Sequence, residues 1–202
     1  MAPSSTATAR AGKRVRVPAA QRRDALVESA VHEFAQGGLH GTPVDRIARA
    51  VGVAQPYVFA LFGSKRELFL AAVERDFEVT ADTFTEAANA YDPSTAEPDV
   101  DLLRAMGLAY RRLLQDNRDY LMLQHHAYAA CDDPIIRDRV RRLFAGLVAR
   151  VQELSGEDPE RIDEFFRYGM WLNAAAAMGV EDLSAASEWV RGEARQEVAR
   201  SG

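Results

Sequence analysis

The side chains with the most specific recognition chemistry in this sequence stand together at Gln55, Pro56 and Tyr57. The amide group of Gln55 can donate and accept a hydrogen bond at once, which matches the N6/N7 edge of adenine. Tyr57 can offer its hydroxyl group or pack on a thymine methyl group. At the start of a short helix, these residue types suit contacts with base edges in the major groove of DNA.

Several neighbouring residues carry groups that suit the phosphate backbone. The Lys65 ammonium group, the Thr42 hydroxyl group and the amides of a helix N-terminus each bind phosphate oxygens. Arg46 and Arg49 are open to two interpretations, because charges on an amphipathic helix can contact phosphate or only water. The candidate DNA-binding residues are Thr42, Arg46, Ala54, Gln55, Pro56, Tyr57, Phe59 and Lys65.

Two short helices joined by a glycine turn are predicted to position these residues. Thr42 is expected to N-cap the first helix, with Pro43 at its first position. Gly52 supplies the turn, and the second helix runs over about residues 55–61. A helix-turn-helix over about 43–62 would place its second helix in the major groove.

The signals that follow end the second helix and begin a longer one. Gly63 is expected to stop the second helix, and Ser64 opens the next with a Ser-x-x-Glu capping box that Glu67 closes. Apolar residues keep a helical rhythm from there to Tyr91. A long helix is therefore predicted to lead away from the helix-turn-helix.

The rest of the chain reads as helices almost throughout, so the predicted fold class is all-α with about nine helices. Asp133-Pro134 and Asp158-Pro159 each provide an N-cap followed by proline at the first helical position. Besides the two short helices, the predicted segments cover about 18–36, 64–91, 100–115, 118–130, 134–154, 159–180 and 183–200.

The stretch from Arg22 to Val73 resembles the N-terminal domain of the TetR family of bacterial transcriptional regulators. The resemblance rests on many spaced positions over about fifty of the 202 residues. They are Phe34-Ala35-Gln36-Gly37-Gly38, Thr42, Ile47-Ala48, Gly52-Val53, the aromatic pair Phe59 and Phe62, and Ser64-Lys65-x-Glu67-Leu68.

Two positions depart from the family's pattern. Where the family usually has a tyrosine two residues after Tyr57, this chain has Phe59, which has no hydroxyl group for phosphate. Phe59 is expected to pack in the core, with a DNA contact as the alternative, because aromatic residues on apolar helical faces usually pack. Ala54 stands where the family often has Ser or Thr, which removes a helix cap.

A three-part organisation is expected. The composition of residues 1–17 predicts a disordered basic arm, and the resemblance implies a three-helix DNA-binding domain over 18–66 and a larger helical ligand-binding and dimerisation domain over 67–202. The resemblance also implies a pocket among the middle helices, although core packing is the favoured interpretation for each candidate taken singly. The candidates are Phe77, Phe84, Met106, Tyr110, Met122, His125, Tyr128, Phe144, Phe166 and Trp171.

A homodimer is expected, because one reading helix contacts too few base pairs to select a genomic site. The resemblance implies dimerisation through a C-terminal four-helix bundle. Small residues that allow close helix approach suggest Gly169, Asn173, Ala174 and Ala177 as interface residues, while the alternative is that this segment is the subunit's own core. The expected DNA partner is a (pseudo)palindromic operator.

The charge of the chain is unevenly distributed. Residues 1–66 carry ten Lys/Arg and four Asp/Glu, a balance of +6, whereas the remainder carries 15 and 26, a balance of −11. Arg10, Lys13, Arg14 and Arg16 give the arm a positive charge that favours DNA. A solvated tail without function and an organelle transit peptide are the alternatives for this segment.

Other classes of function find little support in the sequence. There is no Gly-rich phosphate loop, no Gly-x-Ser-x-Gly elbow and no zinc-ligand spacing, so neither an enzyme nor a cofactor is predicted. His125 and His126 are adjacent and point about 100° apart on a helix, which disfavours a metal site. No apolar run approaches a membrane span, and the single cysteine, Cys131, favours a cytoplasmic location.

The sequence therefore predicts a DNA-binding transcriptional regulator, a repressor that a small apolar effector releases from its operator. Activators exist in the family that the chain resembles, so the sign of regulation stays open at this point. The alternative is a helical protein-interaction module without sequence-specific DNA binding.

Overall fold

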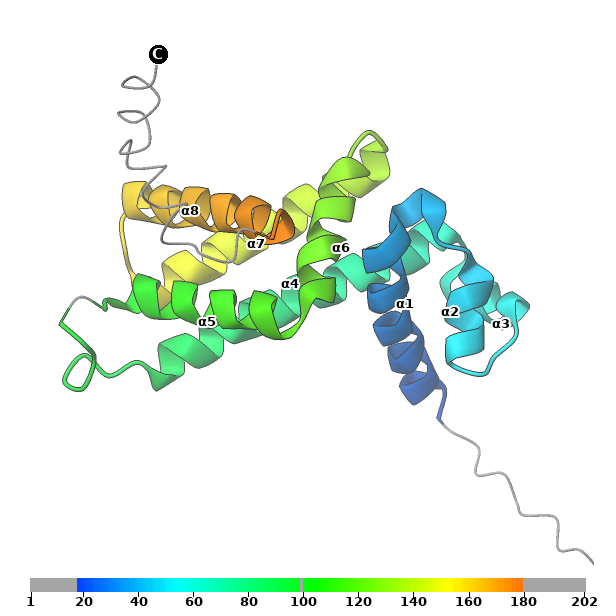
Figure 1. Cartoon of the computed structure of the whole chain (residues 1–202), viewed down its shortest axis with the longest axis horizontal. Helices are drawn as coiled ribbons and strands as arrows, with labels where there is room; N and C mark the ends of the chain where they lie inside the picture. The colour runs from blue at the N-terminus through cyan, green and yellow to red at the C-terminus, as the bar shows by residue number, and fades with distance from the viewer. Residues whose placement is uncertain (1–17, 99, 180–202) are drawn as a thin grey trace, which may run out of the picture.

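The computed structural model describes residues 18–98 and 100–179, which form eight helices and no strand (Figure 1). The all-α fold class is confirmed. The predicted arm (1–17) and the predicted last helix (183–200) lie outside the described residues. The helices are α1 (Ala19–Gly41), α2 (Val44–Ala50), α3 (Gln55–Phe62), α4 (Lys65–Ala90), α5 (Leu102–Asp116), α6 (Arg118–Ala129), α7 (Pro134–Ser155) and α8 (Pro159–Ala177).

The helices form a head and a body that share α4. Helices α1 and α3 pack on the N-terminal part of α4, and α2 packs on α1 and α3 (Figure 1). Helices α5, α6 and α7 pack along the rest of α4, and α8 packs on these three helices. At 26 residues, α4 is about 39 Å long and so extends through both parts. None of the described helices is long and apolar enough to cross a membrane.

Most helix ends follow from the local sequence signals. The Ser64 hydroxyl group accepts a hydrogen bond from the Glu67 amide at 3.1 Å, which confirms Ser64 as the cap of α4. Asp133 and Asp158 cap α7 and α8 in the same way, with proline in the first turn of each helix. Gly63, at φ 81°, ends α3 in a backbone conformation that suits only glycine.

Thr42 does not cap α2, contrary to the prediction. Helix α2 begins at Val44 with Pro43 in the cap position and no side-chain cap. The Thr42 hydroxyl group is buried and donates to the Glu33 carbonyl oxygen of α1 at 2.9 Å. Thr42 therefore fastens the α1–α2 turn to α1, because a hydroxyl group beside a buried carbonyl is better satisfied there than at a helix end.

Helix α1 extends further than predicted, through a break at Gly38. Gly38 has φ 62° and ψ −173°, and the chain resumes a helical turn up to Gly41. A Cβ atom at Gly38 would lie 2.7 Å from Nδ1 of His126 on α6. The absence of a side chain at Gly38 is what lets α6 approach α1, and this contact joins the body to the head.

A second tie between the two parts is an ion pair at the start of α4. Arg66 donates to one oxygen of Asp133 at 3.1 Å, while the other oxygen accepts from the Ile135 amide at 2.8 Å. The Asp133 carboxylate group thus caps the N-terminus of α7 and also binds the first turn of α4.

Gly38→Ala should lower the free energy of unfolding by about 1–3 kcal/mol from backbone strain alone, with a further decrease from the clash with His126. Chemical denaturation followed by circular dichroism measures this quantity. Gly41→Ala is the matched control, because a Cβ atom there meets nothing within 4 Å. Equal stability of the two variants would show that the α1–α6 contact does not depend on Gly38.

Candidate nucleic-acid interface and internal cavity

Helix α3 lies at the outer end of the head, away from α5–α8 (Figure 1). Val58 and Phe62 are four residues apart on one face and are buried in the core. The Arg23 guanidinium group lies over the Phe62 ring, 5.1 Å from its centroid. One face anchors the helix, which leaves Gln55 and Pro56 exposed in its first turn.

Phe59 is 38% exposed, so the expectation that it packs in the core is wrong. Val58 and Phe62 already fill the inward face, and Phe59 points about 100° away from Val58 around the helix. Phe59 lies one turn after Gln55 and therefore shares its side of α3. The outward surface of α3 combines an amide group and an aromatic ring.

The other two candidates of α3 differ in exposure. Tyr57 is half-buried and packs against the core of the head. Ala54 occupies the N-cap position without a side-chain hydrogen bond, since a methyl group cannot accept one. The backbone amides in the first turn of α3 therefore donate no hydrogen bond to a capping side chain at position 54.

The predicted phosphate ligands make contacts inside the protein. Lys65 donates from Nζ to the His40 carbonyl oxygen at 3.3 Å, and partial burial lowers the pKa of its ammonium group. The Arg46 Nε atom lies 2.7 Å from Glu33, and Arg49 pairs with Asp45 at 2.7 Å. Thr42 is buried as well. All four side chains thus make internal contacts that hold the turn and α2 in place, and any contact with phosphate would compete with these.

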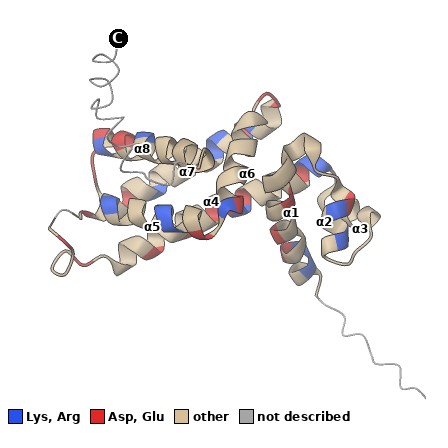
Figure 2. Cartoon of the chain, in the orientation of Figure 1, with Lys and Arg blue, Asp and Glu red and all other residues tan. Residues whose placement is uncertain are grey.

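The positive charge of the described head is modest. Residues 18–66 carry six Lys/Arg and four Asp/Glu, a balance of +2. Figure 2 shows Lys and Arg beside Asp and Glu on α1 and α2. The remaining +4 of the N-terminal balance belongs to residues 1–17, which lie outside the described part of the chain.

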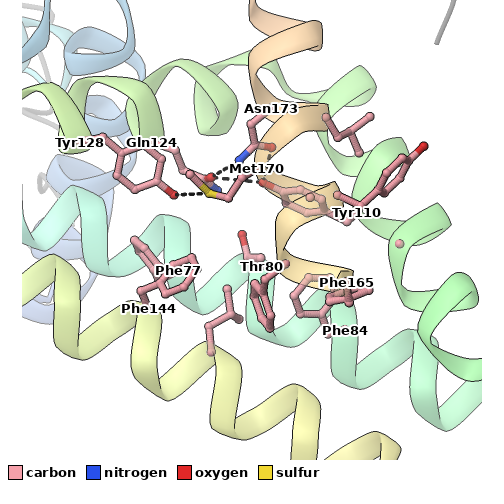
Figure 3. A pocket seen from close by; sticks show the side chains of 16 residues that line it. Phe77, Thr80, Phe84, Tyr110, Gln124, Tyr128, Phe144, Phe165, Met170 and Asn173 are labelled. Atoms are coloured by element: carbon pink, nitrogen blue, oxygen red, sulfur yellow. Dashed lines mark hydrogen bonds between the residues drawn. The ribbon is translucent and has the colours of Figure 1, made fainter. Parts of the chain in front are cut away.

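The body contains a cavity of about 50 Å³ between α4, α5, α6, α7 and α8 (Figure 3). Tyr168 and Met170 belong to its wall and are 51% and 41% exposed, so the cavity reaches the surface beside them. Its other lining residues are Phe77, Thr80, Phe84, Gly107, Tyr110, Gln124, Tyr128, Phe144, Leu147, Phe165, Phe166, Gly169, Leu172 and Asn173.

The structure brings six of the ten candidate pocket residues to this wall: Phe77, Phe84, Tyr110, Tyr128, Phe144 and Phe166. The other four lie elsewhere. Met106 is fully buried in the core, Met122 is half-buried, His125 Nε2 lies 3.2 Å from the Asn173 carbonyl oxygen, and Trp171 stacks on Tyr168. The direction of each side chain is set by its position around the helix, and the residue type alone does not predict that direction.

Among the polar residues of the cavity wall, the sequence predicted Tyr110 and Tyr128 but missed Thr80, Gln124 and Asn173. Tyr110 donates from its hydroxyl group toward Gln124 Oε1 and Asn173 Oδ1 at 3.1 and 2.8 Å, and Asn173 Nδ2 donates to Gln124 Oε1 at 3.0 Å. Gln124 Nε2 in turn donates to Asp76 Oδ1 at 3.2 Å. This polar network, Asp76, Tyr110, Gln124 and Asn173, joins residues nearly 100 positions apart, and no local pattern marks it.

Two of the four candidate interface residues face their own subunit. Asn173 is buried in the polar network, and Gly169 belongs to the cavity wall. Ala174 is exposed and Ala177 is half-buried on α8. Asn173 therefore serves hydrogen bonding within the subunit, and among the four candidates only Ala174 is exposed.

His126 and Cys131 make contacts that stabilise the fold. Within the described residues, no group of three His, Cys, Asp or Glu side chains could hold a metal ion. His126 packs on Gly38. The Cys131 thiol donates to the Ala127 carbonyl oxygen at 3.2 Å, and burial raises the pKa of that thiol, which disfavours the reactive thiolate form.

Known proteins resemble the chain in two ways. Residues 26–72 match the model of the family described as bacterial regulatory proteins, tetR family. The HTH-type transcriptional activator FasR of Mycolicibacterium smegmatis is 38% identical over 60 residues, 30% of this chain and 27% of that protein. The HTH-type transcriptional repressor SCO4008 of Streptomyces coelicolor is 38% identical over 50 residues, 25% of this chain and 26% of that protein.

Both matches thus span about a quarter of the relative's length. The fold is similar over a larger part of the chain. A tetR-family transcriptional regulator from Streptomyces coelicolor superposes with a TM-score of 0.59 at 20% identity, over 82% of this chain and 73% of that one. By sequence, the similarity to the TetR family of bacterial regulatory proteins covers residues 26–72, and the similarity of fold extends over most of the chain.

Proposed function

We propose that the chain is a transcriptional repressor that binds a DNA operator as a homodimer and is released by a small apolar molecule. The observation that carries the proposal is the placement of α3, which is anchored by Val58 and Phe62 and presents Gln55, Pro56 and Phe59 outward. An anchored helix with a free first turn is what docking in the major groove requires. Such a protein acts on chromosomal DNA and would work in the bacterial cytoplasm.

The homodimer follows from the small reading surface. Two heads about 34–36 Å apart would meet successive turns of one DNA face, and the operator would be (pseudo)palindromic. Met170 and Ala174, four residues apart on α8, and Met178 directly after the helix give an exposed apolar face that suits a symmetric partner. Dimerisation through this face would place the two cavities near the axis.

Coupling between cavity and DNA would use the helices that both sites share. A cavity of about 50 Å³ is smaller than the roughly 150 Å³ that accommodates benzene. An effector of ordinary size must therefore push the lining helices apart. Because α6 carries Gln124 in the cavity and His126 against Gly38, such a displacement would reach α1 directly.

We propose repression and not activation because repression requires fewer interaction surfaces. Occupying an operator is sufficient to block transcription, whereas activation needs an additional surface for the transcription machinery. An effector that prefers a different spacing of the heads would lower DNA affinity by its differential affinity for the two states. The protein-interaction alternative has no use for the outward amide and aromatic groups of α3.

Gln55→Ala and Tyr57→Phe should each weaken binding to the preferred DNA sequence by about 1–3 kcal/mol if both side chains contact bases. Binding is measured by fluorescence anisotropy on a sequence selected from a random library and on unselected DNA. Gln115→Ala, an exposed change on α5, is the control. Equal losses on both DNAs would show that these residues contact only phosphates.

Removal of residues 1–17 should reduce the salt dependence of DNA binding. The slope of log K against log salt is expected to flatten by about 0.9 for each phosphate group that the arm no longer neutralises. Replacing Arg10, Lys13, Arg14 and Arg16 by Gln in the full-length chain should have the same effect. An unchanged slope in both proteins would exclude the arm from the interface.

Ala174→Arg should convert the dimer into a monomer, because it puts an unpaired charge in the centre of the α8 face. Sedimentation velocity at micromolar concentration measures the state, and Ala90→Arg, at the exposed end of α4, is the control. A wild-type chain that sediments as a monomer would contradict the proposed homodimer.

A further inference from the structure

We infer that the cavity is selective for small apolar molecules whose polar end donates a hydrogen bond, such as aromatic amines and alcohols, and that it rejects carboxylates. The inference rests on the proposed function only in calling such a molecule an effector. Binding itself is a property of the cavity and can be measured without DNA.

The first support is an acceptor that nothing satisfies. Asp76 is completely buried, and its Oδ1 atom accepts from Gln124, but its Oδ2 atom has no hydrogen-bond partner in the described part of the chain. A buried carboxyl oxygen without a partner is costly, and a donor that reaches it would gain correspondingly. Gln124, the direct partner of Asp76, belongs to the cavity wall.

The second support is an unpartnered hydroxyl group in the wall itself. Thr80 is 2% exposed, and no described group accepts from or donates to its Oγ1 atom. Thr80 lies one helical turn after Asp76, on the same face of α4. Figure 3 shows its hydroxyl group directed toward the side of the cavity where Gln124 and Asn173 lie. Thr80 thus places an unpartnered oxygen in the cavity wall, while Asp76, one turn earlier on α4, is joined to the wall through Gln124.

One acceptor of the polar network, Asp76 Oδ2, has no hydrogen directed at it. The hydroxyl group of Tyr110 has one hydrogen for two acceptors, Gln124 Oε1 and Asn173 Oδ1. With Asp76 Oδ2 also unmatched, an N–H or O–H group from a ligand adds what the network lacks. Burial raises the pKa of Asp76 well above its ordinary value, although the Gln124 hydrogen bond lowers it. A ligand donor at Oδ2 would stabilise the ionised carboxylate and so lower this pKa again.

The aromatic residues of the cavity wall determine which apolar body the ligand can have. Phe84 packs edge-on against Phe165 at 5.5 Å between ring centroids, and Phe144 does so against Phe166 at 5.3 Å. Such rings favour an aromatic or alicyclic body and also attract a cationic head. No Lys, Arg or His belongs to the described lining, so an anionic ligand would be buried without a counter-ion and close to Asp76.

Four molecules of similar size test the selectivity on the full-length chain without DNA: phenol, benzylamine, toluene and benzoate. Chemical-shift titration of the ¹⁵N-labelled protein at millimolar concentrations should show binding of phenol and benzylamine about tenfold tighter than that of toluene. Benzoate should not bind. Tighter binding of benzoate than of phenol, or no binding by any of the four, would overturn the inference.

Two variants locate the selectivity at the unpartnered oxygens. Asp76→Asn and Thr80→Val should each reduce the preference for phenol and benzylamine over toluene by about tenfold while leaving toluene binding unchanged. Thr83→Val is the control, because the Thr83 hydroxyl group already donates to the Val79 carbonyl oxygen at 2.8 Å and is not part of the wall. An undiminished preference in both variants would refute the assignment.

The DNA-release assay is separate from the binding test. If phenol and benzylamine bind selectively but leave DNA affinity unchanged, the proposed repressor mechanism fails and the ligand class stands. If DNA release is caused by benzoate-like anions, the ligand class fails and the repressor mechanism stands.

Discussion

The complete burial of residues 68–73 of α4 is the constraint on which the rest of the structure depends. Helix α1 covers this part of α4, while α5, α6 and α7 cover the remainder. An interior packed at crystal density does not absorb a local shift. Any movement of α4 in the body is therefore carried into the head, and the cavity borders the same helix at Phe77, Thr80 and Phe84.

Much of the fold could be predicted from short-range signals. The caps at Ser64, Asp133 and Asp158 and the glycine stop at Gly63 depend on groups within a few residues, and all four are found in the structure. The boundaries of α4 to α7 lie within about two residues of the prediction, as expected for helix ends. Local chemistry fixes where helices begin and end.

The features that the sequence did not reveal depend on the direction of side chains in space. Thr42 satisfies a carbonyl oxygen of another helix, and Phe59 is exposed because Val58 and Phe62 occupy the inward face. Asn173 is buried against α5 and α6 although its neighbours in sequence suggested an intersubunit contact. For the same reason, Asp76 and Thr80 gave no signal, since their lack of partners is a property of the assembled core.

The two contacts of the Asp133 carboxylate group also bear on which mutations would alter regulation. It serves the beginning of α7 with one oxygen and the Arg66 guanidinium group with the other. Its removal would loosen the orientation of the head while leaving the reading surface of α3 and the cavity wall intact. Genetic selection for regulators that ignore their signal would be expected to recover changes at this codon, far from either functional site.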